Sequence, residues 1–155
     1  MKKALTIALC VLIPTAAFAA DAGYKVVYDG GSLPDVKSGS GMRLVFDSKQ
    51  LGLVYGKADP VSIPSASITE ISYGQDVHRR VGAAIGLAVV SFGIGALMAL
   101  TKSKKHFIGL TWADGDKKGG FAMQCDKKDY RGILAGLEGV TGKKAVDSTA
   151  MTVKN

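Results

Sequence analysis

The side chains best suited to chemistry in this chain are two histidines and an aspartate. His78 and His106 lie on either side of a long apolar segment, and Asp76 lies two residues before His78. If the ends of the segment meet, these side chains could form an acid–base pair, as in a small hydrolase, or hold a metal ion. A metal normally needs three or four well-placed ligands, and histidines beside Arg and Lys are more typical of a membrane interface. We expect no metal and no cofactor.

Other potentially reactive residues have structural interpretations. Asp114 and Asp116 carry oxygens suited to calcium, but two lysines follow them and oppose a cation, and Asp-Gly is a strong turn signal. Cys125 alternates with apolar residues, which predicts a buried thiol. The sequence contains no Gly-x-Ser-x-Gly, Cys-x-x-Cys, His-Glu-x-x-His or P-loop pattern. We therefore expect that the protein is not an enzyme.

The apolar segment covers residues 81–100, with Val81 first and Leu100 last, and nineteen of its twenty residues are apolar or glycine. A helix of twenty residues is about 30 Å long, the thickness of the hydrocarbon core of a bilayer. Basic residues that would suit anionic head groups stand on both sides. They are Arg79, Arg80, Lys102, Lys104 and Lys105. Residues 78–105 are therefore predicted to be a transmembrane helix or a re-entrant insertion.

Three arrangements of this insertion remain open. A single crossing fits the length and the basic flanks, but it would split the surrounding domain and expose strand edges. A re-entrant hairpin that bends near residues 91–95 would keep the domain on one side, with legs of about ten residues, or roughly 15 Å. A hairpin packed on a soluble protein is the third arrangement.

Small residues within the segment suggest a contact between helices. On a continuous helix Gly82, Gly86, Gly93 and Ala96 fall within about 80° of one another. Such a glycine-rich helix face lets two membrane helices approach closely. This pattern predicts self-association, which Gly86→Leu should abolish.

The amino terminus has the features of a secretory signal peptide. Two lysines are followed by apolar residues 4–13, and then by small residues at 17 and 19 that form a cleavage site between Ala19 and Ala20. Residues 1–19 are therefore predicted to be removed on export. The expected location is the bacterial cell envelope, at the inner membrane or in the periplasm.

The charge of the chain is basic and uneven. The formal net charge is +7, and loss of the two leader lysines lowers it to +5. Residues 21–100 carry seven charges of each sign, whereas residues 101–155 carry eleven basic and six acidic residues. A basic carboxyl-terminal half suits an anionic lipid surface. We do not expect nucleic acid as a partner, because the chain has no stacking or arginine-rich motif.

The rest of the chain predicts a β-rich domain in two parts, residues 20–77 and 106–146, with a flexible tail at 147–155. Alternating apolar residues indicate strands near 24–28, 42–46, 51–55, 61–63, 68–73, 108–112 and 121–125. One amphipathic helix is expected from Asp126, as its N-cap, to a stop at Gly142. Its apolar face is Tyr130, Ile133, Leu134, Leu137 and Val140. The predicted class is α+β, mainly β, with a small antiparallel barrel or bent sheet capped by this helix.

Two sets of residues resemble a known family. Residues 63–73, IPSASITEISY, resemble the I-P-x-x-x-I-x-x-I-x-Y element of bacterial pleckstrin-homology-like (PH-like, GRAM-like) domains. Residues 104–107, 128–131 and 141–143 resemble the end of an exported subgroup that often carries an apolar insertion. The resemblance covers residues 24–146 and implies a PH-like barrel. Characterised relatives bind phosphoinositides or protein segments, but the loop at 30–41 has Lys37 as its only basic residue, so phosphoinositide binding does not carry over.

These patterns together predict a non-enzymatic, envelope-associated PH-like module that is embedded in the membrane through residues 81–100. Its expected partners are anionic lipid head groups, itself or another envelope protein. One alternative is a glycine-packed oligomeric membrane assembly or pore. The other is a soluble periplasmic binding protein with a buried hairpin insertion.

Overall fold

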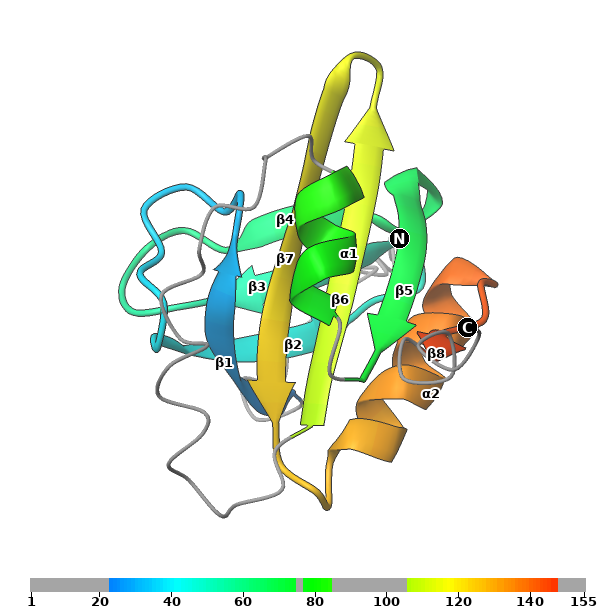
Figure 1. The fold of residues 1–155 in the computed structure, drawn as a ribbon. Helices are drawn as coiled ribbons and strands as arrows, with labels where there is room; N and C mark the ends of the chain where they lie inside the picture. Colours follow the sequence, from blue (N-terminus) through cyan, green and yellow to red (C-terminus); the bar gives the residue numbers. More distant parts are fainter. Residues whose placement is uncertain (1–22, 75–76, 85–105, 148–155) are drawn as a thin grey trace, which may run out of the picture.

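The structure is a computed structural model that describes residues 23–74, 77–84 and 106–147. Within these ranges the chain forms one eight-stranded sheet, two α-helices and a short 3₁₀ helix, η1 (Figure 1). In chain order the elements are β1 (Tyr24–Gly31), β2 (Gly41–Phe46), β3 (Gln50–Val54), β4 (Val61–Pro64), η1 (Ser65–Ser67), β5 (Ile68–Tyr73), α1 (Val77–Ala84), β6 (His106–Asp114), β7 (Lys117–Cys125), α2 (Tyr130–Thr141) and β8 (Val146–Asp147).

The strand order in the sheet is β4-β3-β2-β1-β7-β6-β5-β8. Neighbouring strands are antiparallel throughout, except that β8 runs parallel to β5. The predicted α+β, mainly β class is therefore confirmed. The described part of the chain adds a parallel strand that the sequence did not predict. Asp147 belongs to this strand and not to a flexible tail.

The sheet is strongly bent and open. Strands β2, β3 and β4 cross behind β6 and β7, so the two halves of the sheet face each other (Figure 1). Strands β4 and β5 are consecutive in sequence and joined by η1, but no ladder between them is present in the described residues. Of the predicted barrel and bent sheet, the described residues form the bent sheet.

The hydrophobic core lies between the two halves of the sheet. Alternate residues of a strand point to opposite faces, which accounts for the alternating patterns in the sequence. The largest fully buried side chains of the strands are Leu44, Leu51, Leu53, Ile68, Ile71, Ile108, Leu110, Phe121 and Met123. Burial of such side chains contributes about 1.5–3 kcal/mol each to folding, before the cost in chain entropy.

Helix α2 covers the core at one end. Ile133 and Leu137 are completely buried, as the helical spacing predicted. Two glycines of α2, Gly132 and Gly136, leave room for aromatic side chains of the strands. A Cβ on Gly136 would lie 2.6 Å from the ring of Phe46. The ring of Phe46 packs edge-on against Tyr24 at 5.8 Å, and the Tyr24 hydroxyl approaches Gly132 in the same way.

The ends of α2 differ in how well they were predicted. Gly142 ends the helix with a φ of 69°, as expected for a glycine in this position. The predicted start is wrong, because the helix begins at Tyr130 and its N-cap is Asp129, with no capping bond from the side chain. The carbonyl of Asp126 instead accepts the N–H groups of Asp129 and Tyr130 at 3.0 and 3.1 Å. A turn therefore precedes the helix and delays its first residue.

Candidate functional site: the base of the insertion

The two ends of the insertion lie side by side. Strands β5 and β6 are antiparallel neighbours, with Tyr73 opposite Ile108. Beyond this pair, the N–H of Gly74 donates to the carbonyl of Phe107 at 3.1 Å. We call Tyr73, Gly74, His106 and Phe107 the base of the insertion. The chain leaves the sheet and returns to it at this one place, so residues 75–105 are an excursion from a single sheet.

Strands from before and after the insertion are interleaved in the sheet. Strand β7, which follows the insertion, pairs with β1, and Tyr28 lies opposite Met123. Strand β6 pairs with β5 through Ile71 and Leu110. The two predicted parts of the β-domain therefore form one folding unit. A single crossing of the membrane between them would require both ladders to be absent.

Helix α1 packs on the outer face of the sheet, in front of β6 and β7 (Figure 1). Val77 and Val81 are completely buried and form a second apolar cluster with Phe107 and Ala122. The helix comes close because Gly109 has no side chain. A Cβ there would lie 2.5 Å from Val77 Cγ1 and 2.8 Å from Val81 Cγ2.

An ion pair adds to this docking. The guanidinium Nε of Arg80, which follows the predicted flanking Arg79, donates to Glu70 Oε1 on β5 at 3.0 Å. Both side chains are partly exposed, so the pair contributes at most about 1 kcal/mol. Its main effect is on the orientation of α1, because it links one side of the helix to β5.

Several predicted site residues can now be placed. Val81 is buried where α1 meets the sheet, in contact with the domain itself, and the next residue of α1, Gly82, is also buried. The other predicted membrane, flanking and cleavage residues lie outside the described part, as do Asp76 and the side chains of His78 and Arg79. The predicted membrane, flanking and cleavage residues that lie outside the described part are Gly86, Gly93, Leu100, Lys102, Lys104, Lys105, Ala19 and Ala20.

Three parallel rings lie at the base of the insertion, and we call them the aromatic stack. The Tyr73 hydroxyl and His106 Nδ1 are hydrogen-bonded at 2.8 Å. The Tyr130 ring lies over the His106 ring at 3.9 Å and 5°, and over the Tyr73 ring at 5.5 Å and 8°. Arg131 Nε donates to the Tyr130 hydroxyl at 2.9 Å. The stack joins the end of β5, the start of β6 and the start of α2.

The ionisation of the groups around the stack favours a structural role. Burial, and then the proximity of Tyr130 and Asp147, raise the pKa of Tyr73, so its phenol stays neutral. Burial, and then Asp126 and Asp129, raise the pKa of Cys125 to about 12. The Cys125 thiol therefore stays protonated near neutral pH, and it donates to the carbonyl of His106 at 3.4 Å. A thiolate nucleophile would need the opposite shift.

His106 was a candidate ligand or acid–base group, and the structure gives it other contacts. Its Nδ1 contacts a tyrosine hydroxyl and its ring is stacked. In residues 23–74, 77–84 and 106–147, no group of three or more His, Cys, Asp or Glu side chains could hold a metal ion. The aromatic stack itself was missed, since its three residues were interpreted separately. The signal available in the sequence was a tyrosine and a histidine at the two ends of one insertion.

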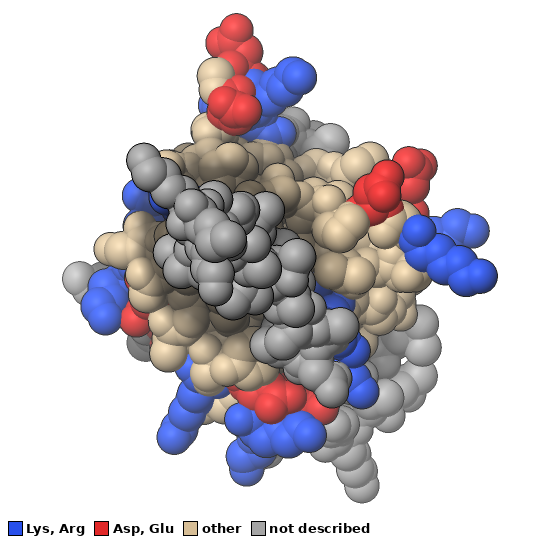
Figure 2. Space-filling view, turned by 180° about the vertical axis from the view of Figure 1, so that it is seen from behind, with Lys and Arg blue, Asp and Glu red and all other residues tan. Residues whose placement is uncertain are grey.

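The loop between β1 and β2 is tied to the domain. The Ser38 hydroxyl donates to the Asp29 carbonyl at 2.7 Å, and the N–H of Gly39 donates to the Tyr28 carbonyl at 2.7 Å. Leu33 of this loop is buried, whereas Lys37 is exposed. Seen from behind, basic and acidic side chains occur together around the rim of the molecule (Figure 2). This face therefore presents no single basic patch among its described residues.

Comparisons with protein-family models and with curated proteins found no match for this chain. The resemblance to PH-like domains accordingly stays a prediction from the sequence. Among the residues that the structure covers, no helix combines the length and apolar character needed to span a bilayer.

Proposed function

We propose that this protein is a non-enzymatic binding module of the bacterial cell envelope, with a PH-like β-domain attached to the membrane by an apolar hairpin. The observation that carries the proposal is the closed base of the insertion. Gly74 and Phe107 are hydrogen-bonded, while the residues between them include the long apolar run. An apolar excursion that starts and ends at one place favours insertion from one side of the membrane.

The length of the run supports a hairpin over a single crossing. Helix α1 takes up Val77–Ala84 on the sheet. Sixteen residues of the apolar run, 85–100, lie beyond it. As one helix they would measure about 24 Å, short of the roughly 30 Å of a hydrocarbon core. As a hairpin with its bend near residues 91–95, the run would have legs of six and five residues, or about 9 and 8 Å of helix, and these legs need not cross the bilayer.

The place of Gly82 bears on the alternative of a glycine-packed assembly. Gly82 belongs to α1, and this helix packs on the sheet through Val77 and Val81. The first residue of the predicted groove therefore lies in a helix that is docked on the domain. We favour a membrane-attached module over an oligomeric pore for this reason.

The assignment to a PH-like domain rests on the sequence element at residues 63–73, which forms the end of β4, η1 and β5. A carboxyl-terminal helix over one end of a bent sheet supports it further. Partners of the module are lipid head groups or another envelope protein. Basic residues near the insertion gain roughly 1 kcal/mol each beside anionic lipid.

Cysteine accessibility and carbonate extraction together test this proposal. Cys125 is first replaced by Ala, and single cysteines are then placed at the exposed residues Lys37 and Lys143, one before and one after the insertion. We expect both to be labelled from the periplasmic side, and the protein to stay in the membrane fraction at high pH. A matched control replaces residues 85–100 with a short Gly-Ser linker and should become soluble. Labelling from opposite sides, or full release of the intact chain by carbonate, would overturn the proposal.

A further inference from the structure

The chain returns to the base of the insertion after α2. Strand β8 pairs in parallel with the end of β5, with Ser72 opposite Val146 and Tyr73 opposite Asp147. It is the outermost strand on its side of the described sheet. An edge strand presents unpaired N–H and C=O groups to solvent unless something covers them. Here β8 covers the last two residues of β5, immediately before the insertion begins.

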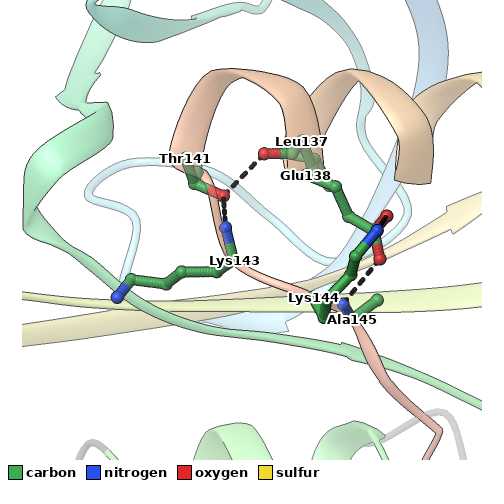
Figure 3. A network of polar contacts seen from close by, with 6 residues as sticks. All are labelled: Leu137, Glu138, Thr141, Lys143, Lys144 and Ala145. Carbon is green, nitrogen blue, oxygen red and sulfur yellow. Dashed lines mark hydrogen bonds and ion pairs between the residues drawn. The ribbon is translucent and has the colours of Figure 1, made fainter.

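One carboxylate holds the segment between α2 and β8 (Figure 3). Glu138 Oε1 accepts the N–H of Ala145 at 2.8 Å, and Glu138 Oε2 lies 3.1 Å from Lys144 Nζ. Thr141 adds a second fastening, since its hydroxyl donates to the Leu137 carbonyl at 2.7 Å and accepts the N–H of Lys143 at 3.2 Å. Residues 143–147 therefore depend on polar contacts with the last turns of α2.

The apolar contribution of this segment is small in comparison. Ala145, which packs against the main core, and Val146 are half-buried, and Asp147 is exposed. Every other strand places at least one fully or almost fully buried aliphatic or aromatic side chain in the core. Segments with few buried apolar contacts open locally at low free energy. The segment can thus detach without disturbing Ile133 and Leu137, which hold α2 on the sheet.

We propose that residues 143–147 form a detachable strap, fastened by the Glu138 carboxylate, that closes the edge of β5 at the base of the insertion. When the strap is closed, Ser72 and Tyr73 are paired with β8. When it opens, this pairing is lost, while α2 and the other strands stay in place. The strap is independent of how the insertion meets the membrane.

Hydrogen exchange of the processed full-length chain tests the strap. Glu138→Ala removes both contacts of the carboxylate, and alanine keeps α2 stable because of its high helix propensity. We expect exchange in peptides that cover Ile71 to Gly74 and Ala145 to Asp147 to become about tenfold faster, the factor typical of losing a hydrogen bond to a charged group. Peptides from α2 and β7 should keep their wild-type rates.

Lys144→Met is the matched control. It removes the ion pair, whose lysine side chain is 90% exposed, but leaves the bond from the Ala145 N–H to Glu138 in place. Exposed ion pairs contribute little, so exchange should change less than twofold. Unchanged exchange in Glu138→Ala, an equal effect of Lys144→Met, or faster exchange throughout the sheet would each overturn the proposal.

Discussion

The two faces of β6 and β7 are packed in different ways. The inner face carries large side chains such as Leu110 and Phe121, which are fully buried in the main core. The outer face carries Gly109 and Ala122, which leave room for the two valines of α1. Large side chains on the inner face hold the domain together. On the outer face, the small residues Gly109 and Ala122 let α1 pack closely on the sheet beside Phe107.

This difference predicts that damage to the inner face is global. Leu110→Ala removes a fully buried side chain and leaves a cavity, so we expect a loss of about 3 kcal/mol in the free energy of unfolding. Chemical denaturation followed by the fluorescence of Trp112 measures it. A loss below 1 kcal/mol would mean that the inner face is not the main source of stability.

Damage to the outer face should be local. Gly109→Ala places a Cβ 2.5 Å from Val77, so α1 must shift or leave the sheet, at an expected cost of about 1–3 kcal/mol. Hydrogen exchange should accelerate in Val77–Ala84 while the β7 core stays protected.

Gly139→Ala is the control for this substitution. Gly139 is an exposed helix residue with open space where the Cβ would be placed, so the change should stabilise the protein by roughly 0.5–1 kcal/mol. If hydrogen exchange in α1 were as slow in Gly109→Ala as in wild type, the contact between α1 and the sheet would tolerate a side chain at this position.

The aromatic stack, whose Tyr73 and Tyr130 pack against the main core, should have a smaller effect. Tyr73→Phe keeps the ring but removes the hydrogen bond to His106, so we expect a loss of about 1 kcal/mol. Tyr55→Phe removes an exposed bond to the Pro34 carbonyl and should cost less. Denaturation midpoints of the two variants give the comparison, and an equal loss would contradict a specific role for the stack.

The strap buries less apolar surface than either face of β6 and β7, so we expect the smallest change in stability there. This change should appear as a pH dependence of hydrogen exchange in β8. The Ala145 N–H first, and then Lys144, lower the pKa of Glu138 below its ordinary value of 4.5. A carboxyl with a lowered folded-state pKa stabilises the fold above its ordinary value, and this contribution is lost as pH falls through the folded-state pKa. Exchange in β8 should therefore increase on acidification, after correction for intrinsic rates. Glu138→Gln should remove this dependence, and a Gln variant with the same acid response would assign the effect to another group.

The prediction of the strands succeeded where burial has a simple period. Alternation located β2 and β3, because each has one face in the core. It also located β6 and β7, whose inward-facing apolar residues alternate although both faces of these strands are largely buried. The helical face of α2 was found for the same reason. Its start was misplaced, since Asp126 has the residue type of an N-cap but the chain first makes a turn.

Other features carried no local signal. The docking of α1 was missed because Val81 reads equally well as the start of a membrane segment and as a residue buried on a sheet. Strand β8 has only two residues, too few for a period, and it depends on a partner far away in the sequence. The same holds for the aromatic stack, whose three rings come from β5, β6 and α2.

The sequence by itself determined the main strands, the capping helix and the presence of a long apolar insertion, because spacing and composition are local properties. Only the tertiary structure decided that both ends of the insertion meet at Gly74 and Phe107 and that β1 and β7 are neighbours. Strand pairing depends on backbone hydrogen bonds, which every residue except proline can donate and accept, so the side chains alone do not specify which strands meet.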